Sequence, residues 1–323
     1  MVPTDCDFML EHRLAKLAAA ATFVLLVIGG TVNPTGSSLA CPEPTLVCHG
    51  QLFPPMVGGV LYEHGHRLAA MTVGLLQIAL TLTLVFRRSA LRRLGWTLLG
   101  LVIAQGALGA ITVKYKLPWF VSTGHLLLGM SYFATLIYTA FRTRPEPTVV
   151  ELDRHARLRD ELGATRRWIA IACGFVFVQL LLGALVRHLG AAMVCLGMPS
   201  CTRSGQWWPE AWVQDVHMIH RGFGAVVAIV TTIAAVQVFR RARSWGSLRL
   251  LALIAPVLVV AQVALGVLTV LTLRAVPLAV GHFAGAASLW ALWMSAWLLT
   301  GQRVPAAART APPDIRGFQL VRA

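Results

Sequence analysis

Residues 104–113 read AQGALGAITV and residues 261–270 read AQVALGVLTV, so one apolar sequence occurs twice, 157 residues apart. The same offset carries Gly124-His125 onto Gly281-His282, and an offset of 154 residues carries His66-Arg67 onto His220-Arg221. At that second offset three further residues recur: Gly29 as Gly183, Gly36 as Gly190, and Cys41 as Cys195. A repeat of this kind indicates two copies of one structural unit.

Composition indicates what the copies are made of. Mean hydropathy is +0.69, 57% of the residues are hydrophobic and 13% are charged, which excludes an ordinary soluble domain. Eight segments are long and apolar enough to cross a bilayer. They lie near residues 14–32, 67–86, 95–113, 118–141, 168–187, 220–239, 248–271 and 278–299. The sequence therefore predicts an all-α integral membrane protein, in which two homologous four-helix bundles provide eight transmembrane helices.

The basic residues predict the orientation. The formal net charge is +15, but 15 of the basic residues fall in the connections after spans 2, 4 and 6, against five after spans 1, 3, 5 and 7. This is the positive-inside pattern. It predicts a multi-pass protein of the cell membrane with both termini in the cytoplasm, and it argues against a nucleic-acid partner.

Four segments follow from the repeat. Residues 1–141 form the N-terminal half, 142–167 an Arg-rich cytoplasmic linker, 168–300 the C-terminal half, and 301–323 a disordered cytoplasmic tail. We read residues 14–32 as a retained helix rather than a cleaved signal peptide, because the stretch that follows it recurs in the second half. Each half has an even number of spans, so the copies share one orientation, as in parallel-repeat membrane proteins.

Four of the ten histidines occupy matched positions: His66 and His125 in the first half, His220 and His282 in the second. Each lies at the start of an even-numbered span, at the predicted outer face. Two imidazoles facing each other in a bundle can ligate a planar metallocofactor from both sides, and haem b suits an apolar bundle. Ordinary interhelical hydrogen bonds remain the alternative. Zinc and c-type haem fit less well, since neither a four-ligand cluster nor Cys-x-x-Cys-His occurs.

Glu63 is a candidate catalytic residue. It precedes His66 by three residues, which places both on one helical face. The repeat has His217 at this position, so the two halves differ chemically here. A carboxylate near a reacting centre can steer protons or stabilise developing positive charge. An exposed interfacial carboxylate is the alternative interpretation.

Two cysteine pairs bracket matched outer loops, Cys41 with Cys48 and Cys195 with Cys201. Outer loops face an oxidising compartment, so we expect disulfides. A structural crosslink and a redox-active pair above a haem both remain open.

These features together resemble the haem A synthase family. The resemblance rests on residues 35–41 (TGSSLAC) with Cys48, on Glu63-x-x-His66-Arg67, Gly124-His125, His220-Arg221 and Gly281-His282, and covers about residues 14–299. It implies oxidation of the C8 methyl of haem O to a formyl group by successive hydroxylations. It further implies substrate haem O at His66 and His125, and resident haem b at His220 and His282. Haem O synthase (a farnesyltransferase) and cytochrome oxidase assembly factors are the implied partners. The family suggests no role for His217.

Two other classes of protein share some of these features. A b-type electron-transfer cytochrome with two haems would have the same histidines, but its haems normally lie toward both membrane faces, whereas all four histidines here are predicted at one. A transporter would suit the parallel repeat, but the spans lack polar residues near their centres.

Overall fold

The computed structural model describes residues 5–145, 157–158 and 160–301, and eight long helices dominate that part of the chain. They are α1 (Asp5–Val32), α2 (Gly58–Arg87), α3 (Arg92–Lys114), α4 (Trp119–Arg142), α6 (Arg166–His188), α7 (Trp212–Arg241), α8 (Gly246–Leu271) and α9 (Val276–Thr300). All eight are long and apolar enough to cross a membrane. The predicted all-α membrane fold is confirmed. The proposed tail from residue 302 onward and most of the proposed linker lie outside the described residues.

Three helices begin well before their predicted spans, and one of them is α1, which starts at Asp5 rather than near residue 14. α2 starts at Gly58 rather than near residue 67, and α7 at Trp212 rather than near residue 220. The added turns of α2 and α7 contain polar residues such as Glu63 and His217, which lower the local hydropathy. Both side chains are nevertheless buried, each 4% exposed. The helices continue outward because buried polar side chains, rather than an apolar stripe, hold these turns in place.

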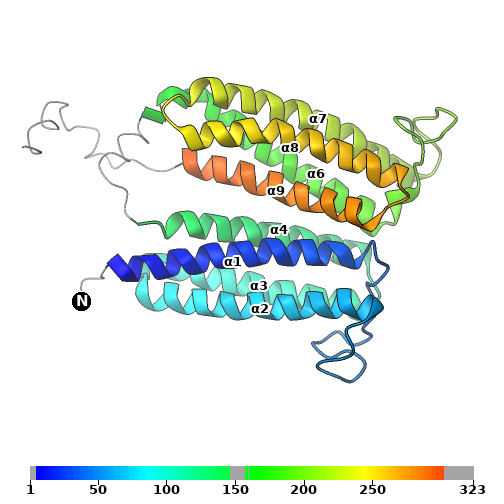
Figure 1. Cartoon of the computed structure of the whole chain (residues 1–323), viewed down its shortest axis with the longest axis horizontal. Helices are drawn as coiled ribbons and strands as arrows, with labels where there is room; N and C mark the ends of the chain where they lie inside the picture. The colour runs from blue at the N-terminus through cyan, green and yellow to red at the C-terminus, as the bar shows by residue number, and fades with distance from the viewer. Residues whose placement is uncertain (1–4, 146–156, 159, 302–323) are drawn as a thin grey trace, which may run out of the picture.

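The helices pack in two sets of four (Figure 1). In the first set α1 contacts α2 and α4, and α3 contacts α2 and α4. The second set repeats this arrangement, with α6 and α8 each contacting α7 and α9. Matched helices therefore have matched neighbours, as the internal repeat predicts. The limits of the two halves along the sequence remain a prediction.

α4, α1, α6 and α9 form the interface between the sets. Met130 and Phe133 of α4 belong to the same buried apolar cluster as Trp290 and Trp293 of α9. The indole N–H of Trp290 donates a hydrogen bond to the carbonyl of Met130 over 3.1 Å. The largest apolar core of the described residues thus fills the second half and extends across the interface to α4.

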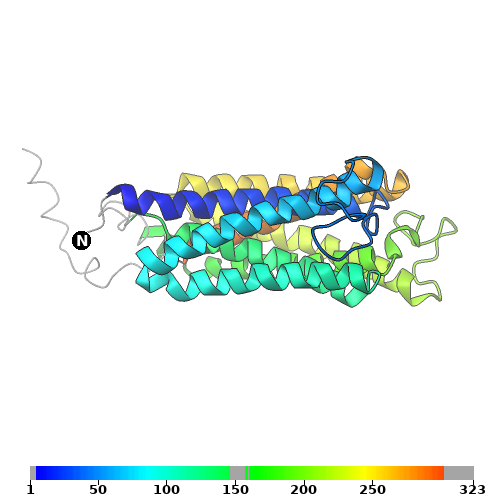
Figure 2. The same ribbon diagram turned by 90° about the horizontal axis from the view of Figure 1, so that it is seen from below.

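Two long connections lie at one end of the molecule, residues 33–57 after α1 and residues 189–211 after α6. We call this the disulfide end. The start of α1 and the end of α9 lie at the opposite end (Figures 1 and 2). The chain leaves α1 and α6 in the same way, through Gly36 and Gly190, both with φ of 70°. That left-handed conformation is one that glycine adopts without steric cost, so the repeat extends into the loops.

Candidate functional site

The four matched histidines lie near the disulfide end, and each has the same position along its helix as its counterpart in the other half. His66 and His220 are each eight residues from the start of their helix, and His125 and His282 are each six residues from theirs. At about 1.5 Å per residue, these positions are roughly 12 and 9 Å along the helix. The structure therefore places both pairs near the disulfide end, roughly one and a half to just over two turns inside their helices rather than at the helix starts.

Each histidine ring lies against a glycine of the preceding helix. A Cβ added to the glycine would lie close to the ring Cε1. The separation would be 2.7 Å for Gly29 and His66, 3.4 Å for Gly109 and His125, 3.2 Å for Gly183 and His220, and 3.2 Å for Gly266 and His282. Both halves therefore use the same device, in which a missing side chain makes room for an imidazole.

The second pair has the ring spacing expected of two ligands to one metal ion. The rings of His220 and His282 are 6.4 Å apart between centroids and nearly perpendicular, at 85°. Two imidazoles on opposite sides of one metal ion, each with a metal–nitrogen bond of about 2 Å, place their centroids roughly 6 Å apart. The spacing fits a haem iron held between the two rings.

The outer nitrogens of this pair have hydrogen-bond partners. His282 Nδ1 lies 3.0 Å from the carbonyl oxygen of Gln262, and His220 Nδ1 lies 3.1 Å from the side-chain amide nitrogen of Gln179. An Nδ1–H that donates to a carbonyl leaves Nε2 with the lone pair that a metal needs. His282 is therefore oriented as a ligand by its own surroundings.

The first pair is held in part by the same contacts. His125 lies near the backbone carbonyl of Gln105, the residue that matches Gln262, although the contact is looser than that of His282. The Nδ1 atom of His66, unlike that of His220, has no hydrogen-bond partner among the described residues. The two halves thus share the histidines and their glycines, and they differ most at the first histidine of each pair.

The structure contains both expected disulfides, Cys41–Cys48 and Cys195–Cys201. His64 is fully buried beside the first, with ligand atoms of all three residues within 4.8 Å of one another. Because the two sulfurs are bonded to each other, this cluster is not available as a three-ligand metal site. The sequence had assigned His64 no role; its Nε2 lies 2.9 Å from the carbonyl of Leu52 and ties the loop to α2.

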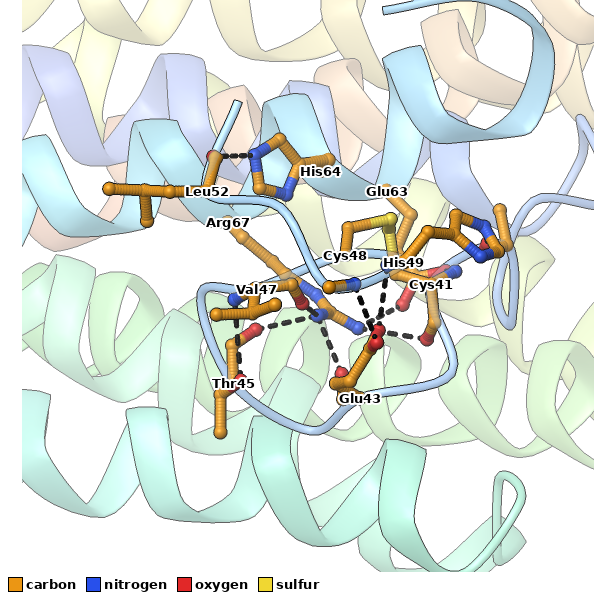
Figure 3. The surroundings of a disulfide bond; sticks show 12 residues. Cys41, Glu43, Thr45, Val47, Cys48, His49, Leu52, Glu63, His64 and Arg67 are labelled. Carbon is orange, nitrogen blue, oxygen red and sulfur yellow. Dashed lines mark hydrogen bonds and ion pairs between the residues drawn. A yellow bond between two sulfur atoms is a disulfide. The ribbon is translucent and has the colours of Figure 1, made fainter. Parts of the chain in front are cut away.

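An arginine holds each disulfide loop against its helix. Arg67 follows His66, and its guanidinium donates to five oxygen atoms (Figure 3). The acceptors are the carbonyls of Cys41, Glu43, Thr45 and Val47 and the carboxylate of Glu63. Arg221 follows His220 and donates to the carbonyls of Cys195, Gly197 and Ser200. Sequence reasoning missed this role, although the repeated His-Arg pair was the signal for it.

The first loop has a second anchor at Glu43. Hydrogen bonds from its own backbone N–H and from the N–H groups of Gly50 and His49 hold the pKa of the Glu43 carboxyl below its ordinary value. The carboxylate therefore stays charged below neutral pH and keeps the turn at residues 49–50 closed.

Glu63 is buried between the loop and the histidine helix. Its Oε1 is 2.6 Å from Arg67 Nη2, and its Oε2 accepts a hydrogen bond from the backbone N–H of Cys41 over 2.9 Å. The interpretation of Glu63 as an exposed interfacial residue is therefore wrong. His217, at the matched position, is buried as well, but its Nδ1 has no partner among the described residues.

Comparisons with known proteins point the same way. Residues 58–294 match the family model described as "Cytochrome oxidase assembly protein". The chain is 29% identical to the "Heme A synthase" of Exiguobacterium sibiricum over 249 residues, which cover 74% of this chain and 80% of that protein. It is 27% identical to that of Shouchella clausii over 81% of this chain and 87% of that protein. It is 29% identical to the "Heme A synthase" of Symbiobacterium thermophilum over 79% of this chain and 84% of that protein.

The family match covers most of the chain, from the start of α2 into α9, and contains Glu63 and all four matched histidines. The relatives extend over both halves. The chain therefore belongs to the haem A synthase family of cytochrome oxidase assembly proteins.

Proposed function

We propose that the chain is a haem A synthase, which oxidises the C8 methyl of haem O to a formyl group by successive hydroxylations. The observation that carries the proposal is the presence of two matched histidine pairs in a chain whose relatives are named for this activity. The pairs are chemically unequal, as expected if one holds a resident group and the other receives a substrate.

The resident haem b belongs to His220 and His282 in this proposal. Their 6.4 Å centroid separation and the contact from Gln262 support it, because a permanent ligand pair benefits from rings that are already oriented. When bound, haem b supplies one-electron redox chemistry through its iron. The chain contributes the two ligands and the glycines that admit their rings.

The substrate haem O belongs to His66 and His125. The Nδ1 atom of His66 has no hydrogen-bond partner among the described residues, which leaves this ring freer to adjust and suits a site that must bind one haem and release another. Glu63 stands on the same face as His66, and its carboxylate is directed by Arg67 and by the backbone of Cys41. A carboxylate fixed in this way stabilises positive charge at a carbon that is losing electrons, or guides the protons released there.

Orientation and partners complete the proposal. The positive-inside distribution places the disulfide end outside the cell membrane and both termini in the cytoplasm. Haem O synthase would supply the substrate, and cytochrome oxidase assembly factors would receive the product. Placing both pairs near one membrane face suits haem processing there better than electron transfer across the bilayer, which is the activity of the alternative, an electron-transfer cytochrome with two haems.

The test is pigment extraction from the purified protein and its histidine variants. We expect haem B together with haem O or its oxidised products from the wild type. His220→Ala should lose haem B, whereas His66→Ala should keep haem B and form no haem A. Two equivalents of haem B with no haem O or haem A would instead establish the electron-transfer cytochrome. Equal haem loss from both variants would refute the division between the pairs.

A further inference from the structure

Arg187, in the last turn of α6, reaches from the second half of the molecule into the first. Its Nη2 lies 3.2 Å from the carbonyl oxygen of Gly29 and 3.4 Å from that of Gly30, both in α1. The guanidinium also lies over the ring of Phe283 in α9, 5.7 Å from its centroid. Arg187 therefore occupies the interface between the halves, near the disulfide end.

This position is next to the first histidine pair. Gly29, whose carbonyl Arg187 contacts, is the glycine against the ring of His66. The next residue of α6, His188, also crosses the interface, because its Nδ1 lies 3.2 Å from the hydroxyl of Thr123, two residues before His125. The end of α6, which belongs to the second half, thus approaches both His66 and His125, which belong to the first.

The charge of Arg187 has no carboxylate to balance it in the described residues. Its Nε is buried and lacks a hydrogen-bond partner. Arg274, in the turn between α8 and α9, adds a second positive charge to these surroundings. Cationic side chains in the apolar part of a membrane protein are costly unless they are paired. A guanidinium with a buried, unpartnered Nε and no carboxylate beside it among the described residues indicates a site for an anion.

Helix capping accounts for only part of this arrangement. A cation near the C-terminal end of α1 interacts favourably with its last carbonyls, which explains the contacts of Nη2. Capping explains neither the unpartnered Nε nor the presence of Arg274. The fold itself does not need an arginine here, because the matched residue in the first half is Asn33.

We propose that Arg187, assisted by Arg274, binds a propionate carboxylate of the haem held by His66 and His125. This inference rests on the proposed function and adds a positioning residue to it. Haem is apolar over its ring and carries two carboxylates along one edge, so a haem between apolar helices needs cations at that edge. A guanidinium matches a carboxylate in shape and charge, and binds it through two parallel hydrogen bonds. The second half of the molecule thereby completes the substrate site of the first.

The test compares haem with its dimethyl ester, in which both carboxylates are blocked. Each ligand is titrated into purified protein that retains its resident haem, and binding is followed by absorbance. The wild type should bind haem more tightly than the ester. Arg187→Gln should reduce this preference roughly 10- to 100-fold, the value of a charge-assisted hydrogen bond, and Arg187→Lys should restore part of it.

Arg203→Gln is the matched control, because it removes one exposed arginine from the second disulfide loop, at the same end of the molecule. It should keep the wild-type preference, and the spectrum of the resident haem reports that each variant is folded. An Arg187→Gln protein that still prefers haem by the wild-type factor overturns the role of Arg187 alone. A wild type that binds no second haem, or binds it equally well after His66→Ala, overturns the proposed substrate site as well.

Discussion

Gly29 leaves room for the ring of His66, so Gly29→Ala tests directly whether that ring is a haem ligand. An added Cβ would come 2.7 Å from Cε1 of the imidazole, whereas ordinary contact begins at 3.4 Å. The ring would have to retreat by roughly 0.7 Å, and metal ligands tolerate displacements of only about 0.2 Å. We therefore expect the substitution to disturb ligation at the first pair.

The size of the effect of Gly29→Ala on stability and haem affinity follows from two opposing contributions. Crowding of this kind costs about 1–3 kcal/mol, and replacing glycine by alanine inside a helix returns about 1 kcal/mol of stability. The fold should therefore persist. If the crowding falls on the bound state, haem affinity at the first pair should drop roughly 5- to 150-fold. The measurement is an absorbance titration of haem O into protein that retains its resident haem.

Other glycines provide a graded series of controls. Gly74→Ala, in the helix that carries His66, adds a methyl group with nothing within 4 Å and should bind haem as the wild type does. Gly183→Ala, at 3.2 Å from His220, should weaken retention of the resident haem but leave the first site unchanged. Wild-type affinity in Gly29→Ala, or equal losses in all three variants, would show that the glycines do not position haem ligands.

Three further predictions concern α2 and its loop. Glu63→Gln should keep normal membrane levels and normal haem B while accumulating haem O or a partly oxidised haem, with turnover reduced about 10²- to 10³-fold; haem A production at the wild-type rate would contradict a catalytic role. Arg67→Gln should loosen the first disulfide loop and expose its amides to hydrogen exchange, while exchange in the second loop stays unchanged; a loop that remains protected would show that the arginine is dispensable. A reporter fused at residue 45 should be active only outside the cytoplasm, and a cytoplasmic signal would reverse the proposed orientation.

The sequence alone predicts much of the fold. The apolar runs give the number and approximate positions of the eight helices, and the repeat gives their grouping, because both depend on periodicities that a single chain displays. The starts of α2 and α7 were placed eight or nine residues late, because hydropathy falls wherever side chains such as Glu63 occur. Such residues join a helix when tertiary partners satisfy them, and those partners cannot be read from local sequence.

The site shows the same division. The repeat singles out His66, His125, His220 and His282, and the structure brings the second pair to ligand spacing. The sequence did not predict the contacts that long side chains make with residues far away in the chain. Arg67 bonds to residues 20 to 26 positions earlier, and Arg187 to residues more than 150 positions away. Nothing in the spacing of the sequence distinguishes these arginines from exposed ones.

The hydrogen bond from the Cys41 amide to Glu63 makes the carboxylate dependent on how the protein matures. Cys41 and Cys48 close a short covalent ring, and that ring presents the amide to which Glu63 binds. A chain inserted without thiol oxidation would still place every helix and every histidine, since none of these needs the crosslink. Its Glu63 would lose a fixed donor and keep only a flexible arginine. The helices would thus be inserted first, and the Glu63 carboxylate would reach its final orientation only after the disulfide has formed.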